Sequence, residues 1–194
     1  MNDKPHYPTV GDVCLLMQAY ALSGNNGLTA DAYAALGTAH RTLKHRKPDT
    51  MLHTVREDVL SDGTLANTNA IAKWWEEVQN AFAVIVLMEQ RGGLALARTL
   101  LARHQALHAS RKVWQATPLW ERLFTGRHNA LAAQYKQDRQ ETNLLRHAMR
   151  FVGAGDLNSM RHRMKRSGFD QTQLEHVQRL VKAHTGKYIR LTAT

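Results

Sequence analysis

Apolar residues recur at intervals of three, four and seven positions along most of the chain, which is the period of an α-helix with one buried face. A clear example is the series Leu96, Leu100, Leu107 and Trp114. No segment alternates polar and apolar residues with β-branched enrichment over more than a few positions, as a half-buried strand would. We therefore expect an all-α protein, a bundle of about seven to eight helices with no significant β-sheet, built as one unit or as two packed helical subdomains.

Capping residues, glycines and prolines mark where these helices should begin and end. Thr9 and Asp12 have the spacing of a capping box at the start of the first helix. Pro48 should end the second helix, because the residue before a proline is pushed out of the helical region. The expected helices cover residues 9–24, 29–47, 49–63, 67–92, 94–117, 131–153, 156–168 and 170–186, with a short turn containing Trp120 and Gly126 before the sixth.

Three features indicate a cytoplasmic protein without a membrane segment. The longest apolar run, Ala81 to Met88, has eight residues, far fewer than the ~20 that a membrane-spanning helix needs. Residues 1–8 contain two prolines and two charges and have no apolar run of the kind that a secretory signal has, so we expect a flexible arm there. The single cysteine, Cys14, cannot form an internal disulfide, which is consistent with a reducing compartment.

Charge divides the chain into two unlike halves. Residues 1–97 hold 8 Lys and Arg against 10 Asp and Glu, whereas residues 98–194 hold 18 against 6, which together give the 26 and 16 of the whole chain. A segregated charge of this kind makes a directional field that attracts phosphate backbones. We therefore expect a near-neutral half over residues 9–92 that packs or oligomerises, a basic half over 94–185 that binds a polyanion, and a tail over 187–194.

The densest cationic segment is the run from Arg161 to Arg166. On a helix, its charged residues lie opposite the apolar stripe of Leu157, Met160 and Met164, so that apolar packing backs a broad cationic front. We expect contacts with the phosphate backbone of DNA or RNA, in a nucleoprotein-complex subunit or a DNA-binding regulator, although solvated surface cations give the same pattern. The expected contact residues are Arg161, Arg163, Lys165 and Arg166, surrounded by Arg146, Arg150, Lys182, Lys187 and Arg190.

Residues 29–47 have two interpretations. A turn at Gly37 would make a helix-turn-helix whose second helix reads bases through Arg41, Lys44 and Arg46. Tyr33 stands where a small residue usually lets the two helices cross, which favours the alternative, one ordinary helix with a basic end that its dipole stabilises.

No catalytic, metal or cofactor site is predicted. His104 and His108 have the one-turn spacing of zinc ligands, but no third ligand is evident, and a satisfied core histidine is the simpler interpretation of His104. Arg103 and His108 match the arginine-to-histidine spacing of HEPN-type α-helical ribonucleases, and this resemblance implies a metal-independent ribonuclease as one alternative function. Chance alone accounts for most such matches in a chain with 11 histidines.

A second alternative is a helical adaptor or assembly subunit whose basic half meets an acidic protein. An exposed apolar patch beside the cations would favour it, because protein interfaces bury apolar anchors. The order of a central apolar helix, a Gly92-Gly93 break and a basic helical half also resembles, over about half of the chain, the small backbone-binding subunits of ribonucleoprotein complexes such as CRISPR effectors. This resemblance implies a role in a complex and assigns no residue roles.

Overall fold

The computed structural model describes residues 7–24, 27–61, 63, 67–124 and 127–154, and single residues at 175, 179, 182 and 183. Within these residues the chain forms helices and no strand, which confirms the all-α class. None of these helices is long and apolar enough to cross a membrane. The expected helices over 156–168 and 170–186 lie outside the described residues. The elements are α1 (Val10–Leu22), α2 (Ala30–Leu43), α3 (Val55–Ser61), α4 (Thr68–Gln90), α5 (Gly93–Ala116), α6 (Leu119–Phe124) and α7 (Arg127–Ala154).

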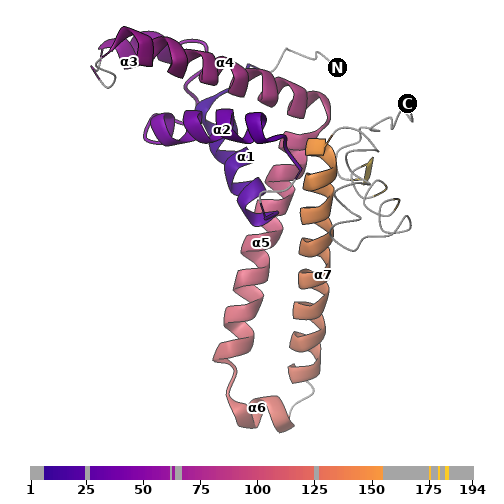
Figure 1. Ribbon diagram of the computed structural model, residues 1–194. Helices are drawn as coiled ribbons and strands as arrows, with labels where there is room; N and C mark the ends of the chain where they lie inside the picture. Colours follow the sequence, from indigo (N-terminus) through magenta and orange to yellow (C-terminus); the bar gives the residue numbers. More distant parts are fainter. Residues whose placement is uncertain are drawn as a thin grey trace.

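The helices form a head and a long projection (Figure 1). Helices α1 to α4 make the head, α5 and α7 run side by side in opposite directions away from it, and α6 connects them at the far end. The most extensive packing in the described chain is between α5 and α7, followed by α2 against α4. The α5–α7 hairpin is therefore held to the head at one end only.

Buried apolar side chains concentrate where the hairpin enters the head. Leu16 of α1, Leu36 of α2 and Ile85 of α4 have no exposed surface, and neither do Leu94 and Leu100 of α5. Beyond Leu100, no side chain of α5 is fully buried. A two-helix hairpin buries only one seam, so the outer part of α5 and α7 keeps most of its surface in solvent.

Capping residues and a glycine account for several helix boundaries. At the start of α1 the Asp12 amide donates to the Thr9 hydroxyl at 3.3 Å, and the Thr9 amide donates to the Asp12 carboxylate at 3.0 Å, completing the capping box. Asn67 accepts from the first amides of α4. Gly92, at φ 73°, separates α4 from α5 in a conformation that favours glycine.

Two predicted helix boundaries are wrong, and at the start of α3 a long-range contact is the reason. Residues 49–54 are not helical, and α3 begins at Val55. Instead, the Val10 amide donates to the Thr50 carbonyl at 2.9 Å and the Leu52 amide donates to the Pro8 carbonyl at 2.9 Å. The backbone before α3 is thus held by the segment before α1. Helix α2 ends at Leu43, ahead of the expected Lys47.

The prediction of a short turn around Trp120 is also wrong. Residues Leu119–Phe124 form the six-residue helix α6 directly after Pro118. Proline suits the residue just before or at the first helical position, because its φ is already helical and its missing amide is not needed there. Helix α6 thereby closes the far end of the hairpin.

Residues 30–43 form one continuous helix, so no turn occurs at Gly37. Gly37 is buried within α2, and the Arg41 guanidinium donates to the Thr38 hydroxyl at 3.1 Å, one turn back on the same helix. The interpretation as one ordinary helix with a basic end is therefore confirmed. Arg41, Lys44 and Arg46 lie at or just beyond the end of α2 and not on a separate reading helix.

The last turn of α7 is fastened to the head by three side chains. The Tyr20 hydroxyl lies 3.4 Å from the Met149 carbonyl oxygen. The Arg150 Nε donates to the Ser23 carbonyl at 2.7 Å, and Arg91 donates to the Val152 carbonyl at 3.1 Å. The Ser23 and Val152 carbonyls lie at the ends of α1 and α7 and have no intrahelical partner, so two of these contacts satisfy them.

Gly27 lets the α1–α2 connection touch the backbone of α7. A Cβ atom at Gly27 would lie 2.6 Å from the Arg150 Cα, and the φ of Gly27 is +117°. Both its conformation and its closeness to α7 therefore require glycine. Gly153 meets the same junction from the other side, where a Cβ would collide with the Tyr20 hydroxyl.

Replacing Gly27 with alanine should lower the free energy of unfolding by about 3 kcal/mol, because strain at positive φ adds to a backbone clash. Gly63→Ala is the matched control: its φ is +63°, and a Cβ there meets nothing within 4 Å. That control should cost about 1 kcal/mol. Urea unfolding of both variants measures the difference, and equal losses would contradict a tight contact at Gly27.

Candidate functional site

Cations on the α5–α7 hairpin outnumber acids. Helix α5 contains Arg98, Arg103, Arg111 and Lys112 and no acidic residue. Helix α7 contains two acidic residues and five lysines or arginines. This imbalance is the structural form of the charge asymmetry in the sequence.

Four of the α7 cations share one side of the helix. Lys136, Arg139, Arg146 and Arg150 are separated by three, seven and four residues, and at about 100° per residue these steps keep them on one stripe. Lys136 and Arg139 are exposed, while Arg146 and Arg150 are half-buried. The stripe borders the seam that packs against α5.

Both acids of α7 are used elsewhere. Asp138 is buried in the seam, where it accepts from the Ser110 hydroxyl at 2.7 Å and from the Gln134 amide at 2.9 Å. Glu141 pairs with Arg103 at 3.0 Å and, five residues before Arg146, lies about 140° around the helix from it. Neither carboxylate therefore faces the stripe of cations.

Helix α5 contributes a matching row from the facing side. His104, His108 and Arg111 are spaced by four and three residues, so they also share one stripe. The rings of His104 and His108 meet edge to face, with centroids 4.6 Å apart. Burial, followed by the neighbouring His108 and Arg146, lowers the pKa of His104. The contacts of Ser110 with Asp138 and of Arg103 with Glu141 set the register of the two helices, which brings His104 to the level of Arg146.

The two rows stay together along the hairpin because α5 and α7 are antiparallel. Seven residues along α5 from His104 is Arg111, and seven residues back along α7 from Arg146 is Arg139. Equal steps in opposite directions keep each pair at the same level. We call this surface the cationic flank and define it by His104, His108, Arg111, Lys136, Arg139 and Arg146.

Two buried nitrogen atoms on the cationic flank have no hydrogen-bond partner within the described residues. They are the Nδ1 of His104 and the Nε of Arg146. The expectation of a satisfied core histidine is thus wrong for His104, which is half-buried with one ring nitrogen unpaired. A buried donor such as the Arg146 Nε is costly to leave unpaired, and its burial closes this atom to an external ligand.

Arg150 is occupied by the head, although the sequence groups it with Arg146. Its Nε bonds the Ser23 carbonyl, and its Nη1 lies 3.4 Å from the His147 Nδ1. Burial, and after it the charge of Arg146, lowers the pKa of Arg150. Within the described structure Arg150 orients α7, which leaves Arg146 as the predicted cation nearest the histidines.

The other predicted contact residues are only partly placed. Lys182 is exposed. The remaining residues, Arg161, Arg163, Lys165, Arg166, Lys187 and Arg190, lie outside the described residues. Sequence reasoning missed Arg111, Lys136 and Arg139, although their spacing relative to His104 and Arg146 was a usable signal.

The alternative catalytic pair is divided between two sides of α5. Arg103 pairs with Glu141, whereas His108 contacts His104. A five-residue separation places the two side chains about 140° apart around the helix. Across the part of the chain that the structure describes, no three His, Cys, Asp or Glu side chains gather as a metal site would require.

Comparison with known proteins adds no further assignment. No protein-family model matches the chain. No curated protein and no solved structure matches it either.

Protonation of His147 should make folding sensitive to acid. Burial, then Arg150 and Arg146, lowers the pKa of His147 from 6.5 to about 4. Between these values the unfolded chain binds more protons than the folded one, so stability is lost as the pH falls from 6.5 toward 4. One proton accounts for at most about 1.4 kcal/mol per pH unit, and solvent screening of this half-buried ring reduces that figure.

Urea unfolding at pH 7 and pH 5 measures this dependence. His147→Gln should flatten it, since glutamine keeps an acceptor for Arg150 and does not titrate. The control is His45→Gln, at an exposed position beyond the end of α2, which should keep the wild-type dependence. An unchanged slope in His147→Gln would refute the assignment.

Proposed function

We propose that the protein binds the phosphate backbone of a nucleic acid through its basic half, with the cationic flank of the α5–α7 hairpin as one contact surface. The observation that carries the proposal is the stripe of cations on α7, with Arg111 on the facing side of α5 and both acids of α7 directed elsewhere. Such a surface suits a polymer with regularly spaced negative charges.

The arginines of the cationic flank favour a specific contact with phosphate over a diffuse attraction to any anion. Arg111, Arg139 and Arg146 carry planar guanidinium groups that can bind two oxygens of one phosphate. The Asn143 side-chain oxygen accepts from the Arg146 Nη1 at 3.3 Å and so orients this guanidinium. The run Arg161–Arg166 belongs to the same proposal as a second contact region, on the charge of its sequence alone.

Contacts of this kind bind without strong base preference. Phosphate contacts position a protein on nucleic acid, whereas base edges must be read for specificity. Non-specific dissociation constants of ~10⁻⁴–10⁻⁶ M at physiological salt are expected. Arg41, Lys44 and Arg46 remain candidates for base contacts from the end of α2.

The double variant Arg139→Glu/Arg146→Glu should bind duplex DNA, single-stranded DNA or RNA about tenfold or more weakly at ~50 mM salt. Because the variant lacks two phosphate-binding side chains, the slope of log affinity against log salt should fall by about two for duplex DNA. Fluorescence anisotropy with each nucleic acid at ~50 and ~200 mM salt measures both quantities and identifies the preferred polymer.

A control with the same change in total charge isolates the cationic flank. Arg56→Glu/Lys73→Glu alters two exposed cations of the head and should reduce affinity by no more than about threefold. Arg41→Glu/Lys44→Glu and Arg163→Glu/Arg166→Glu test the end of α2 and the C-terminal run in the same way. If the head variant and the flank variant weaken binding equally, the flank is not a contact surface.

A second candidate function is an assembly subunit that binds an acidic protein surface. The hairpin tip favours it, because Leu119 and Trp120 of α6 are 72% and 64% exposed beside a cationic helix. Titration with polyglutamate tests this candidate. It predicts affinity similar to that for single-stranded DNA of equal charge, whereas the nucleic-acid function predicts much weaker binding to polyglutamate.

A further inference from the structure

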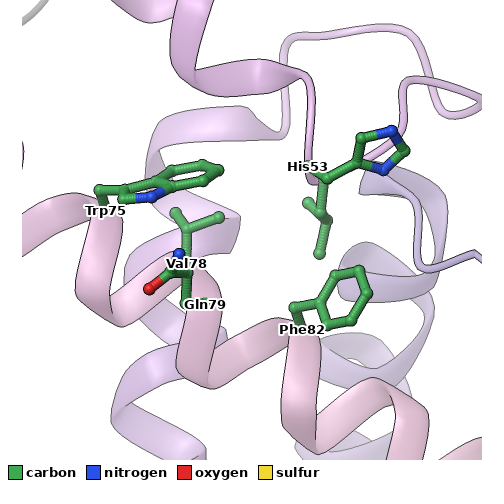
Figure 2. Close-up of a pocket in the computed structure, with 6 residues that line it drawn as sticks. His53, Trp75, Val78, Gln79 and Phe82 are labelled. Atoms are coloured by element: carbon green, nitrogen blue, oxygen red, sulfur yellow. The ribbon is translucent and has the colours of Figure 1, made fainter.

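The head contains an apolar cavity of about 330 Å³ between α4 and the segment that precedes α3. Figure 2 shows four of its residues rising from α4, with the rings of Trp75 and Phe82 at its two sides and His53 on the facing segment. Val78 and Leu52 make its buried floor, while His53 and Gln79 are exposed at its mouth. We call this cavity the α4 pocket, lined by Leu52, His53, Trp75, Val78, Gln79 and Phe82.

The sequence that flanks the residues of the α4 pocket has more acids than cations. Over residues 55–77 the sequence has Arg56 and Lys73 against five acids, a balance of −3. Arg56 lies 5.9 Å from the centre of the Trp75 ring, so one of these two cations already contacts an aromatic face. The acids are Glu57, Asp58, Asp62, Glu76 and Glu77. An apolar pocket flanked by acidic sequence favours a ligand with an apolar side chain that is itself flanked by cations.

The tip of the hairpin has the complementary properties. Leu119 and Trp120 are the most exposed large apolar side chains of the described residues, at 72% and 64%. Residues 111–127, which surround them in sequence, hold four cations against the single acid Glu121, a balance of +3. An exposed indole in a cationic segment of the sequence and an apolar pocket in an acidic one match in polarity and in the sign of the flanking charge.

The tip and the α4 pocket of one molecule lie far apart. The hairpin runs straight away from the head, with α6 at its far end (Figure 1). Helix α5 alone, with 24 residues, covers about 36 Å at ~1.5 Å per residue. The two surfaces can therefore meet only between molecules.

We propose that the hairpin tip of one molecule binds the α4 pocket of a second copy of this chain, with Trp120 as the side chain that enters the pocket. The two contacting surfaces differ, so each molecule keeps a free tip and a free pocket after one contact. A head-to-tail contact of this kind builds rings or open chains. It names the acidic partner of the assembly-subunit candidate and rests on it, and it is independent of nucleic-acid binding.

The size of the two surfaces predicts a weak contact. A cavity of about 330 Å³ is near the lower end of the ~300–1,000 Å³ range of small-molecule pockets, so it suits one bulky side chain and not a whole helix. Interfaces this small belong to the transient class that buries less than ~1,200 Å². Self-association should therefore depend on concentration and weaken as salt screens the complementary charges.

Sedimentation velocity of the full chain over about a hundredfold range of concentration tests the proposal. The wild type should form species larger than a monomer as the concentration rises. Trp120→Ala removes the side chain that enters the pocket, and Gln79→Arg places a cation at its mouth; both positions are exposed, so both variants should fold. Each variant alone should associate about tenfold or more weakly than the wild type.

Mixing the two variants provides the decisive measurement. Trp120→Ala retains an intact pocket and Gln79→Arg retains an intact tip, so the mixture should form a one-to-one dimer that neither variant forms alone. Leu87→Ala, at another exposed apolar position of α4, is the matched control and should associate like the wild type. A monomeric wild type, an unaffected Trp120→Ala or no dimer in the mixture would each overturn the proposal.

Failure of this proposal is distinguishable from failure of the assembly-subunit candidate. Binding of polyglutamate at the level of single-stranded DNA, without self-association, would leave the candidate standing with a different acidic partner. Self-association through Trp120 with weak polyglutamate binding would support the contact between copies and show that the apolar side chain, and not charge, provides most of its affinity.

Discussion

The attachment of the last turn of α7 to the end of α1 determines the shape of the molecule. At this junction the Arg150 guanidinium meets the Ser23 carbonyl, and the Tyr20 hydroxyl meets the Met149 carbonyl. Gly27 and Gly153 allow the backbones to come close enough for these bonds. Because α7 is held here and α5 continues from α4 through Gly92, the hairpin leaves the head in one fixed direction.

The projection of the hairpin explains why its charges remain available. A helix inside a bundle has neighbours on several sides, and its cations are readily paired. Among the described residues, the outer parts of α5 and α7 pack mainly against each other, with Asp138 and Thr142 in the seam. Of the two carboxylates of α7, Asp138 is hydrogen-bonded inside the seam and Glu141 forms an ion pair with Arg103. The remaining side of the pair therefore keeps a positive potential.

The sequence predicted those helix boundaries that depend on bonds between neighbouring residues. It did not predict the boundaries that depend on long-range contacts. Thr9, Asn67 and Gly92 specify helix ends through bonds within a few residues, so their boundaries were predictable. The start of α3 depends on bonds between the backbones of residues 8–11 and 48–52, which no local pattern records. The same is true of the candidate site. The charge of the sequence indicated Arg146 and Arg150, but only the fold shows that the Arg150 Nε donates to the Ser23 carbonyl.

Asn143 shows how a cation can be positioned without being neutralised. Its side-chain oxygen accepts from the Arg146 Nη1 at 3.3 Å. An aspartate there would have nearly the same shape, and its charge would form an ion pair that reduces the field outside the protein. The neutral amide orients the guanidinium and leaves its charge intact, and Glu141 is turned to the other side. Because an exposed ion pair adds little stability, the neutral amide costs the fold little, and it suits the external anion of the proposed function.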